Sequence, residues 1–246
     1  MELSGNTILV TGGSNGIGLA LAKRFVRQGN EVIICGRDEE KLARAKDEVP
    51  QFHTKACDVG DEQQRAELYE WAASEFPRLN VLVNNAGIQR RIDLKEGDEW
   101  ENTRSEIAIN LEAPIHLTQL FLPQLVAQPR AAVVNVTSGL SFVPLANVPV
   151  YCATKAALHS FTLSMRHQLK DTSVQVIEVI PPAVDTDLGG PGLHTFGVNI
   201  DEFADAVFKG LESNEKEIAY GTALTSSRAS RKELDEIFAG MNKRFS

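Results

Sequence analysis

Tyr151, Lys155 and Ser138 are the side chains whose types and spacing could carry out a reaction. If residues 150–170 form a helix, Tyr151 and Lys155 lie one turn apart on the same face. A phenol has a pKa of about 10, and at an effective dielectric constant of about 20 a cation about 5 Å away lowers that pKa by about two. Tyr151 is then predicted to act as general acid and base. Ser138 would hold the oxygen on which charge develops when a carbonyl is reduced or an alcohol is oxidised.

A Tyr-x-x-x-Lys spacing also occurs by chance on surface helices, so the elements that would position it matter. Short apolar, β-branched segments alternate with amphipathic ones, which is typical of strands buried on both faces of a parallel sheet. The order predicts an α/β fold with a doubly wound parallel sheet, helices on both faces (a Rossmann fold) and ligands at the carboxyl ends of the strands. The expected strands cover residues 7–10, 32–34, 52–59, 81–83, 131–136 and 174–180, and the expected helices 16–28, 38–49, 61–76, 101–126 and 150–170.

Pro114 falls inside the pattern at 101–126 and is expected to kink that helix after Asn110.

The first expected strand leads directly into a glycine-rich turn, residues 11–18, and then into a helix. Glycines at 12, 16 and 18 would let the backbone turn tightly and let a pyrophosphate approach the N–H groups at the helix N-terminus. A purely structural turn is the alternative. The position of residues 11–18 after the first strand of an alternating pattern favours the phosphate site.

These motifs, in this order, resemble the short-chain dehydrogenase/reductase family over nearly the whole chain. They are Thr11, Gly12, Gly16 and Gly18, the Asn-Asn-Ala-Gly sequence at 84–87, Asn110, Ser138, Tyr151 and Lys155. Residues 84–89, 151–160 and 202–210 further resemble the DltE-like branch of that family. The resemblance implies an oxidoreductase that uses NADP(H) or NAD(H).

The resemblance also implies a role for each catalytic residue. Tyr151 would transfer the proton, Ser138 would hold the substrate oxygen, and Lys155 would tune Tyr151 and hydrogen-bond the nicotinamide ribose. Asn110 would hold a water behind Lys155, through which Tyr151 exchanges its proton with solvent; the alternative for Asn110 is a polar residue that satisfies a helix kink. The residues expected to bind the cofactor are Gly12, Ser14, Asn15, Gly16, Ile17, Gly18, Arg37, Asp58, Val59, Asn85, Ala86, Gly87, Tyr151, Lys155, Pro181, Val184 and Thr186.

One position departs from the family pattern. Pro182 stands where the family usually has glycine after the sixth strand, which fixes φ and removes an N–H.

Arg37 at the end of the second strand favours NADP(H) over NAD(H). A carboxylate at this position would bind the adenosine ribose and repel a 2′-phosphate, whereas a guanidinium suits phosphate. Ser14 could add a hydroxyl. Asn15 is neutral where many NADP-preferring relatives have a second basic residue, and Asp38 is expected to cap the next helix. NAD(H) therefore stays possible, and a solvated surface charge is the alternative for Arg37.

Composition places the chain among globular proteins. Its 246 residues suit one large domain, and 43% of them are hydrophobic. A net charge of −8 argues against nucleic-acid and anionic-membrane partners. No leader-like start or long apolar segment is visible, so a cytoplasmic protein is expected. Cys35, Cys57 and Cys152 form no metal-binding pattern with histidine, and no metal is expected.

The substrate side is less distinctive. Residues 139–149, with Leu140, Phe142, Val143 and Leu145, are expected to form an apolar wall. Residues 189–199 are expected to form a substrate flap, and residues 222–246 a helical tail whose apolar stripe covers its own core, the substrate mouth or a neighbouring subunit. By the same resemblance, residues 101–126 and 150–170 would build a homodimer or homotetramer.

The predicted function is interconversion of an alcohol and a carbonyl by hydride transfer. A catalytically silent NADP(H)-binding redox regulator is the alternative from another class, and the intact Ser138, Tyr151 and Lys155 speak against it. A sugar-nucleotide epimerase is a further enzymatic alternative, but only about 60 residues follow Ile180, which leaves little room for its larger substrate domain.

Overall fold

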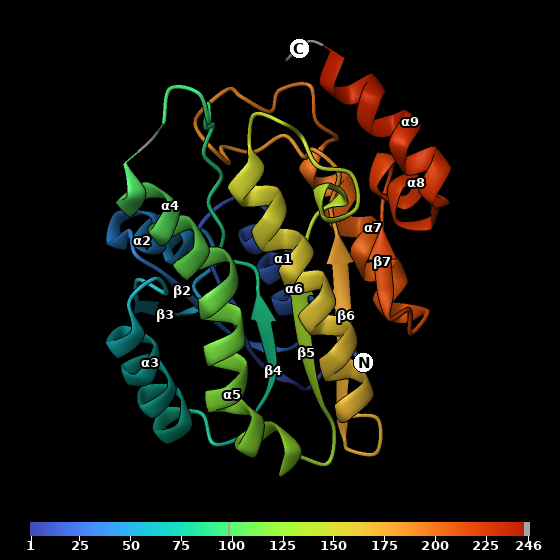
Figure 1. Ribbon diagram of the computed structural model, residues 1–246. Coiled ribbons are helices and arrows are strands. Elements are labelled where there is room, and N and C mark those ends of the chain that lie inside the picture. The colour runs from blue at the N-terminus through green and yellow to red at the C-terminus, as the bar shows by residue number, and fades with distance from the viewer. Residues whose placement is uncertain (98, 244–246) are drawn as a thin grey trace.

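A computed structural model describes residues 1–97 and 99–243. Its centre is a seven-stranded parallel sheet with the strand order β3-β2-β1-β4-β5-β6-β7 (Figure 1). The strands are β1 (Thr7–Thr11), β2 (Glu31–Gly36), β3 (His53–Ala56), β4 (Leu79–Asn84), β5 (Ala131–Val136), β6 (Val174–Ile180) and β7 (Glu217–Ala219). The helices are α1 (Gly16–Arg27), α2 (Glu39–Glu48), α3 (Glu62–Glu75), α4 (Trp100–Ile107), α5 (Ala113–Val126), α6 (Pro149–Gln168), α7 (Ile200–Glu212), α8 (Thr222–Arg228) and α9 (Arg231–Asn242). The predicted doubly wound fold is confirmed.

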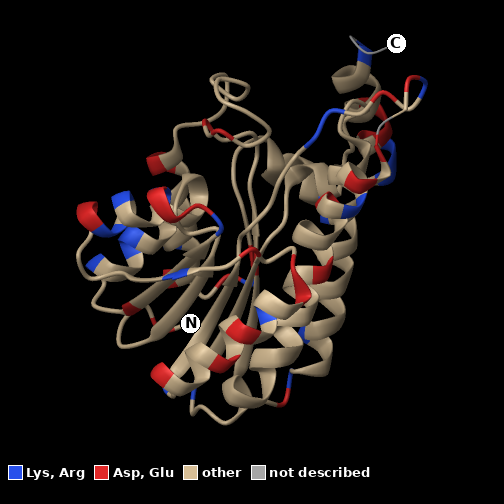
Figure 2. Ribbon diagram, turned by 90° about the vertical axis from the view of Figure 1, so that its left-hand side faces the viewer, with Lys and Arg blue, Asp and Glu red and all other residues tan. Residues whose placement is uncertain are grey.

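Alternate residues of the central strands enter two separate cores, because side chains of a strand point to opposite faces. Ile8 and Val10 of β1 pack with α1, α2 and α7 on one face. Leu9 between them packs with α3, α5 and α6 on the other, nearer face in Figure 1. In Figure 2 most of the strand length carries no charge, and acidic and basic residues are interspersed over the helices and loops. Burial on both faces is what makes these strands continuously apolar in the sequence.

The expected helix 101–126 is divided in two. Residues Ala108–Glu112 form a π-helical turn between α4 and α5, in which Ala113 N–H bonds to the carbonyl of Ala108. The ring of Pro114 would clash with the carbonyl of Asn110 in a continuous α-helix, and proline has no N–H to bond to it. The π-helical turn lies where the kink was expected, and it contains the buried Asn110.

Two strand predictions needed correction. The third strand, β3, covers only His53–Ala56, whereas residues 52–59 were predicted. The edge strand β7 was not predicted, because its three residues include a single buried apolar side chain, Ile218. In the described part of the chain, none of the helices combines the length and hydropathy needed to cross a membrane.

Candidate active site

A cavity of about 1040 Å³ opens at the carboxyl ends of the strands. In Figure 1 this is the side of the arrowheads, over which the loop after β6 and α9 lie. Most of the residues predicted as catalytic or cofactor-binding line it together: Gly12, Ser14, Asn15, Gly16, Ile17, Arg37, Asp58, Val59, Asn85, Ala86, Gly87, Ser138, Tyr151, Lys155, Pro181, Val184 and Thr186. Gly18 and Asn110 do not line it.

Ser138, Tyr151 and Lys155 converge on the floor of the cavity. All three are buried, and the Ser138 side chain is close enough to the Tyr151 phenol to lower the pKa of that phenol. The Lys155 ammonium lies 5.7 Å from the centre of the Tyr151 ring. It donates a hydrogen bond of 2.8 Å to the backbone carbonyl of Val136, at the end of β5. Ser138 Oγ also accepts the Leu140 N–H at 3.1 Å, so its orientation is fixed by the turn that follows.

The expected lowering of the Tyr151 pKa is not found in the protein by itself. Burial raises the pKa of the Tyr151 phenol, because the phenolate loses hydration, and the hydrogen bond from Ser138 only partly opposes this effect. Burial also lowers the pKa of Lys155 to about 8. The prediction was wrong because it counted the charge of the lysine and left out the desolvation of both groups. The nearby carboxylate of Glu106 adds to the rise in the phenol pKa.

Asn110 lies behind the cavity instead of in its wall. Its side-chain oxygen accepts the Ile88 N–H at 2.9 Å, and its amide donates to the Ile88 carbonyl at 2.8 Å. The same amide donates to Thr154 Oγ1 at 3.3 Å, which ties the π-helical turn to α6. Asn110 therefore fixes the segment after β4 against the helix that carries Tyr151. Its role in a water path stays a prediction.

The glycine-rich turn has the backbone geometry that its sequence predicts. Gly12 and Gly16 have φ values of 62° and 54°, in the left-handed region that favours glycine. Asn15, the residue before α1, makes no side-chain cap, so the first N–H groups of the helix are left for another acceptor. Asn85 donates from its side-chain amide to the carbonyls of Thr11 and Gly12, at 2.9 and 3.2 Å, and so supports the backbone of this turn.

Gly18 supports this turn by packing. A Cβ at this position would lie 2.4 Å from both the Gly12 carbonyl oxygen and Asn85 Nδ2. We therefore expect Gly18→Ala to lower the free energy of unfolding by about 1–3 kcal/mol, the usual cost of overpacking. Chemical denaturation measures this, with Gly240→Ala as the control, because a Cβ at Gly240 meets nothing within 4 Å. Equal effects of the two substitutions would contradict the packing role.

Near Arg37 the cavity is lined by a second cation that was not predicted from the sequence. Lys41 on α2 lines the cavity together with Arg37. Asp38 caps α2 as predicted, accepting the Lys41 N–H at 2.9 Å, and Lys41 lies in the first turn of this helix. The spacing of a basic residue four positions after Arg37 was the available signal. Asp58 accepts the Gly60 N–H at 2.9 Å, which shapes the turn after β3.

The backbone at the unusual proline is paired on both sides. The Pro181 carbonyl accepts the Gly139 N–H at 2.8 Å, which joins the ends of β5 and β6. Val198 donates its N–H to the Ala183 carbonyl and accepts the Asp185 N–H, so the base of the expected flap is closed. A Cβ at Gly221 would lie 3.7 Å from the Pro182 ring. Pro182 thus packs toward the start of α8.

The helical tail covers the mouth of the cavity in this chain. Ile237 and Met241 of α9 line the cavity, facing the apolar wall formed by Leu140, Val143 and Leu145. Asn242 fixes the end of α9 to this wall: its side-chain oxygen accepts the Ala146 N–H at 2.7 Å, and its amide donates to the Pro144 carbonyl at 3.1 Å. The sequence had left the partner of this apolar stripe open.

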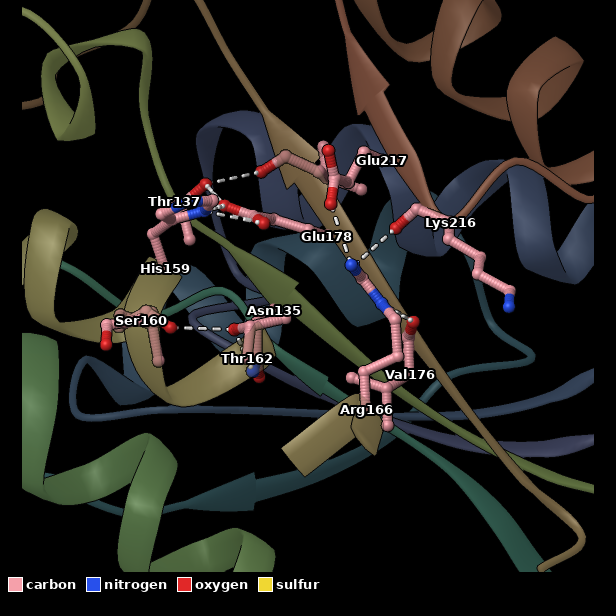
Figure 3. A network of polar contacts seen from close by, with 12 residues as sticks. Asn135, Thr137, His159, Ser160, Thr162, Arg166, Val176, Glu178, Lys216 and Glu217 are labelled. Carbon is pink, nitrogen blue, oxygen red and sulfur yellow. Dashed lines mark hydrogen bonds and ion pairs between the residues drawn. The ribbon is translucent and has the colours of Figure 1, made fainter. Parts of the chain in front are cut away.

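Phe142 does not belong to the wall, contrary to the prediction. Its ring packs edge-on against His159 on α6, with the ring centres 4.7 Å apart. His159 Nδ1 in turn lies 2.9 Å from both carboxylate oxygens of Glu178 on β6, which is fully buried (Figure 3). No spacing pattern in the sequence indicates that Glu178 is the partner of His159.

The His159–Glu178 contact predicts a pH-dependent stability. The hydrogen bond to Glu178 raises the pKa of His159, and partial burial opposes this rise. A histidine whose pKa is raised in the folded state contributes stability that is fully present below its unfolded pKa, about 6.5, and is lost as the pH rises through the folded pKa. The difference in unfolding free energy between the wild type and His159→Asn should therefore decrease above about pH 6.5. In a Glu178→Gln background this dependence should disappear, and its persistence there would contradict the assignment.

Known proteins resemble this chain in sequence and in fold. The family model for short chain dehydrogenases matches residues 6–193. The uncharacterized oxidoreductase DltE of Bacillus subtilis (strain 168) is 54% identical over 248 residues, with 98% of each chain covered. A short chain dehydrogenase from Burkholderia cenocepacia J2315 in complex with NADP has a TM-score of 0.84 at 28% identity, covering 97% of this chain and 99% of that one. A short chain dehydrogenase/reductase from Burkholderia phymatum in complex with NAD has a TM-score of 0.85 at 21% identity over 96% of both chains, which shows a shared fold. The chain belongs to the short-chain dehydrogenase/reductase family of oxidoreductases, in its DltE-like branch.

Proposed function

We propose that the protein is an NADP(H)-preferring oxidoreductase that interconverts an alcohol and a ketone or aldehyde. The observation that carries this proposal is that Ser138, Tyr151 and Lys155 line the same cavity as the glycine-rich turn, with the Lys155 ammonium 5.7 Å from the centre of the Tyr151 ring. Two hydroxyl groups that share one site can both bond to one substrate oxygen. That is the arrangement a carbonyl needs when its oxygen gains charge.

The residues fit a bound dinucleotide. The uncapped N-terminus of α1 and the turn at Gly12 and Gly16 offer N–H groups and open backbone for a pyrophosphate. A bound nicotinamide would supply the hydride at its C4, or accept it, and its oxidised form would add a positive charge to the site. Lys155 would hold the nicotinamide ribose, and Thr186 would contact the carboxamide. The NADP complex of the 28% identical relative supports the same cofactor class.

Arg37 and Lys41 support NADP(H) over NAD(H). Both line the adenosine end of the cavity, and together they could bracket a 2′-phosphate with two positive charges. The Asp38 carboxylate accepts the Lys41 N–H as the cap of α2, so it serves the helix and not a ribose.

In the proton step, Tyr151 donates its phenolic proton to the substrate oxygen during reduction and takes it back during oxidation. Ser138 donates a hydrogen bond to the same oxygen and keeps the carbonyl carbon facing the cofactor. Because the pKa of Tyr151 is raised, the phenol stays protonated before the hydride is transferred. Lys155 stabilises the phenolate that remains. Residues 189–199, as the expected flap, and α9 would exclude water from the hydride path.

Absorbance of the reduced nicotinamide, followed with a panel of ketones, aldehydes and alcohols, tests the function. Steady consumption of the reduced cofactor with at least one carbonyl supports the proposal. Saturable binding of NADP(H) without consumption across the panel would favour a redox regulator instead.

We further propose that α4, α5 and α6 form the interface of a homodimer or homotetramer. Val126 of α5 and Leu163 of α6 expose more than two-fifths of their surface in the single chain. Light scattering that gives a monomeric mass would contradict this assembly.

A further inference from the structure

A buried acid and a histidine lie directly behind the catalytic serine. His159 follows Lys155 by one turn of α6, so both side chains share a face of that helix. Glu178 of β6 is fully buried, and a buried carboxylate needs hydrogen-bond donors around it. It has two: His159 Nδ1 at 2.9 Å and Thr137 Oγ1 at 2.7 Å (Figure 3). Neither His159 nor Glu178 lines the cavity, so neither can touch the substrate.

Thr137 connects this pair to the active site. It immediately precedes Ser138. Thr137 and the peptide unit that joins it to Val136 are held by three hydrogen bonds. Its N–H donates to the Val179 carbonyl at 2.9 Å, and its hydroxyl donates to Glu178. The carbonyl of the same peptide unit, from Val136, accepts the Lys155 ammonium at 2.8 Å. Movement of Thr137 would therefore shift both Ser138 and the acceptor that orients Lys155.

His159 also holds the segment on the other side of Ser138. Its ring packs against Phe142, which follows the short turn Gly139–Ser141. His159 thus contacts Phe142, after Ser138, directly. It contacts Thr137, before Ser138, through the carboxylate of Glu178. The two contacts fix both ends of a six-residue stretch, 137–142, whose second member must meet Tyr151.

We propose that His159 and Glu178 form a positioning pair that holds Ser138 in place beside the Tyr151 phenol in the cavity. This inference rests on the proposed function, in which both hydroxyl groups act on one oxygen. It assigns a role to two residues outside the cavity and explains why an acid is retained in the interior of a parallel strand.

The first test removes the histidine and then the whole pair. His159→Leu leaves Glu178 buried without its main donor, so this variant loses both stability and activity. The double variant His159→Leu/Glu178→Leu removes the unpaired charge, and replacement of a buried ion pair by apolar residues commonly preserves stability. We expect its melting temperature to return close to that of the wild type, while kcat stays about 10- to 100-fold low, because a shift of about 1 Å in a reacting group costs up to about 100-fold.

A conservative variant should rescue the activity. The side-chain amide of His159→Asn can place an N–H near the position of Nδ1, so it can still donate to Glu178. We expect kcat within about threefold of the wild type for this variant. The dissociation constant for NADP(H) should be unchanged in His159→Leu, in the double variant and in His159→Asn. Glu217→Gln is the matched control: it removes an acid of the neighbouring strand that pairs with Arg166 in the same region (Figure 3) and should leave kcat unchanged.

NMR provides a readout that needs neither substrate nor turnover. The chain has three tyrosines, so isotope-labelled tyrosine gives a spectrum in which Tyr151 is assigned by Tyr151→Phe. The Cζ signal of Tyr151 should shift in the double variant toward its position in Ser138→Ala, and stay in place in His159→Asn. If the wild type reduces no carbonyl, the proposed function fails while this arm still tests the pair. An unmoved Tyr151 signal, or recovery of kcat together with stability in the double variant, would overturn the inference.

Discussion

Tyr151→Phe should lower kcat by about 1000-fold while the dissociation constant for NADP(H) changes by less than about threefold. The substitution removes one oxygen and its proton, and positioned general acid–base groups contribute about 100- to 10,000-fold to rates. The ring stays in its apolar surroundings of Val148, Leu140 and Leu145, so the shape of the cavity is kept. Steady-state kinetics with the best carbonyl of the panel and titration of the cofactor measure the two quantities.

The matched control for this variant is Tyr69→Phe. Tyr69 lies on α3 and packs edge-on against Phe121, with ring centres 5.1 Å apart, on the face of the sheet away from the glycine-rich turn. Its kcat should equal that of the wild type. Retention of more than about one-tenth of kcat in Tyr151→Phe would remove Tyr151 from the proton step.

The second large effect concerns the cofactor. Arg37→Leu should weaken NADP(H) binding by about 10- to 100-fold and leave NAD(H) binding within about threefold. A hydrogen bond to a charged group contributes about 1.5–3 kcal/mol, and only NADP(H) carries the phosphate that would receive it. Titration of both cofactors gives the ratio directly.

Arg44→Leu is the control, because Arg44 is exposed on the same helix α2 as Lys41 and carries the same charge outside the cavity. It should leave the ratio of the two dissociation constants unchanged. An equal loss of affinity for NADP(H) and NAD(H) in Arg37→Leu would show that Arg37 does not read the phosphate.

The sequence predicted the elements that are determined by local pattern. Continuous apolar strands such as 131–136 and the turn with Gly12 and Gly16 were found where expected, because burial on two faces and positive φ values leave direct marks in the residue types. The interruption near Asn110 was predicted from the missing N–H of Pro114, although its form as a π-helical turn was not.

Features that depend on tertiary packing were missed. Glu178 and His159 are nineteen positions apart and lie on different elements, so no spacing rule pairs them. The predicted direction of the shift in the Tyr151 pKa was wrong. Desolvation depends on how completely the phenol is buried, which only the packed structure determines. The contact of Asn242 with Pro144 and Ala146 likewise joins the last helix to a loop in the middle of the chain, and no residue pattern links these two segments.

Direct transfer of hydride to a carbonyl carbon is the central claim, and a deuterium label tests it. NADPH carrying deuterium at both C4 positions is mixed with the best carbonyl of the panel, and the alcohol is examined by mass spectrometry and NMR. We predict that deuterium from one face of the nicotinamide appears at the former carbonyl carbon, and that Tyr151→Phe forms this product about 1000-fold more slowly. Alcohol without deuterium, or equal product formation by the wild type and Tyr151→Phe, would contradict the account.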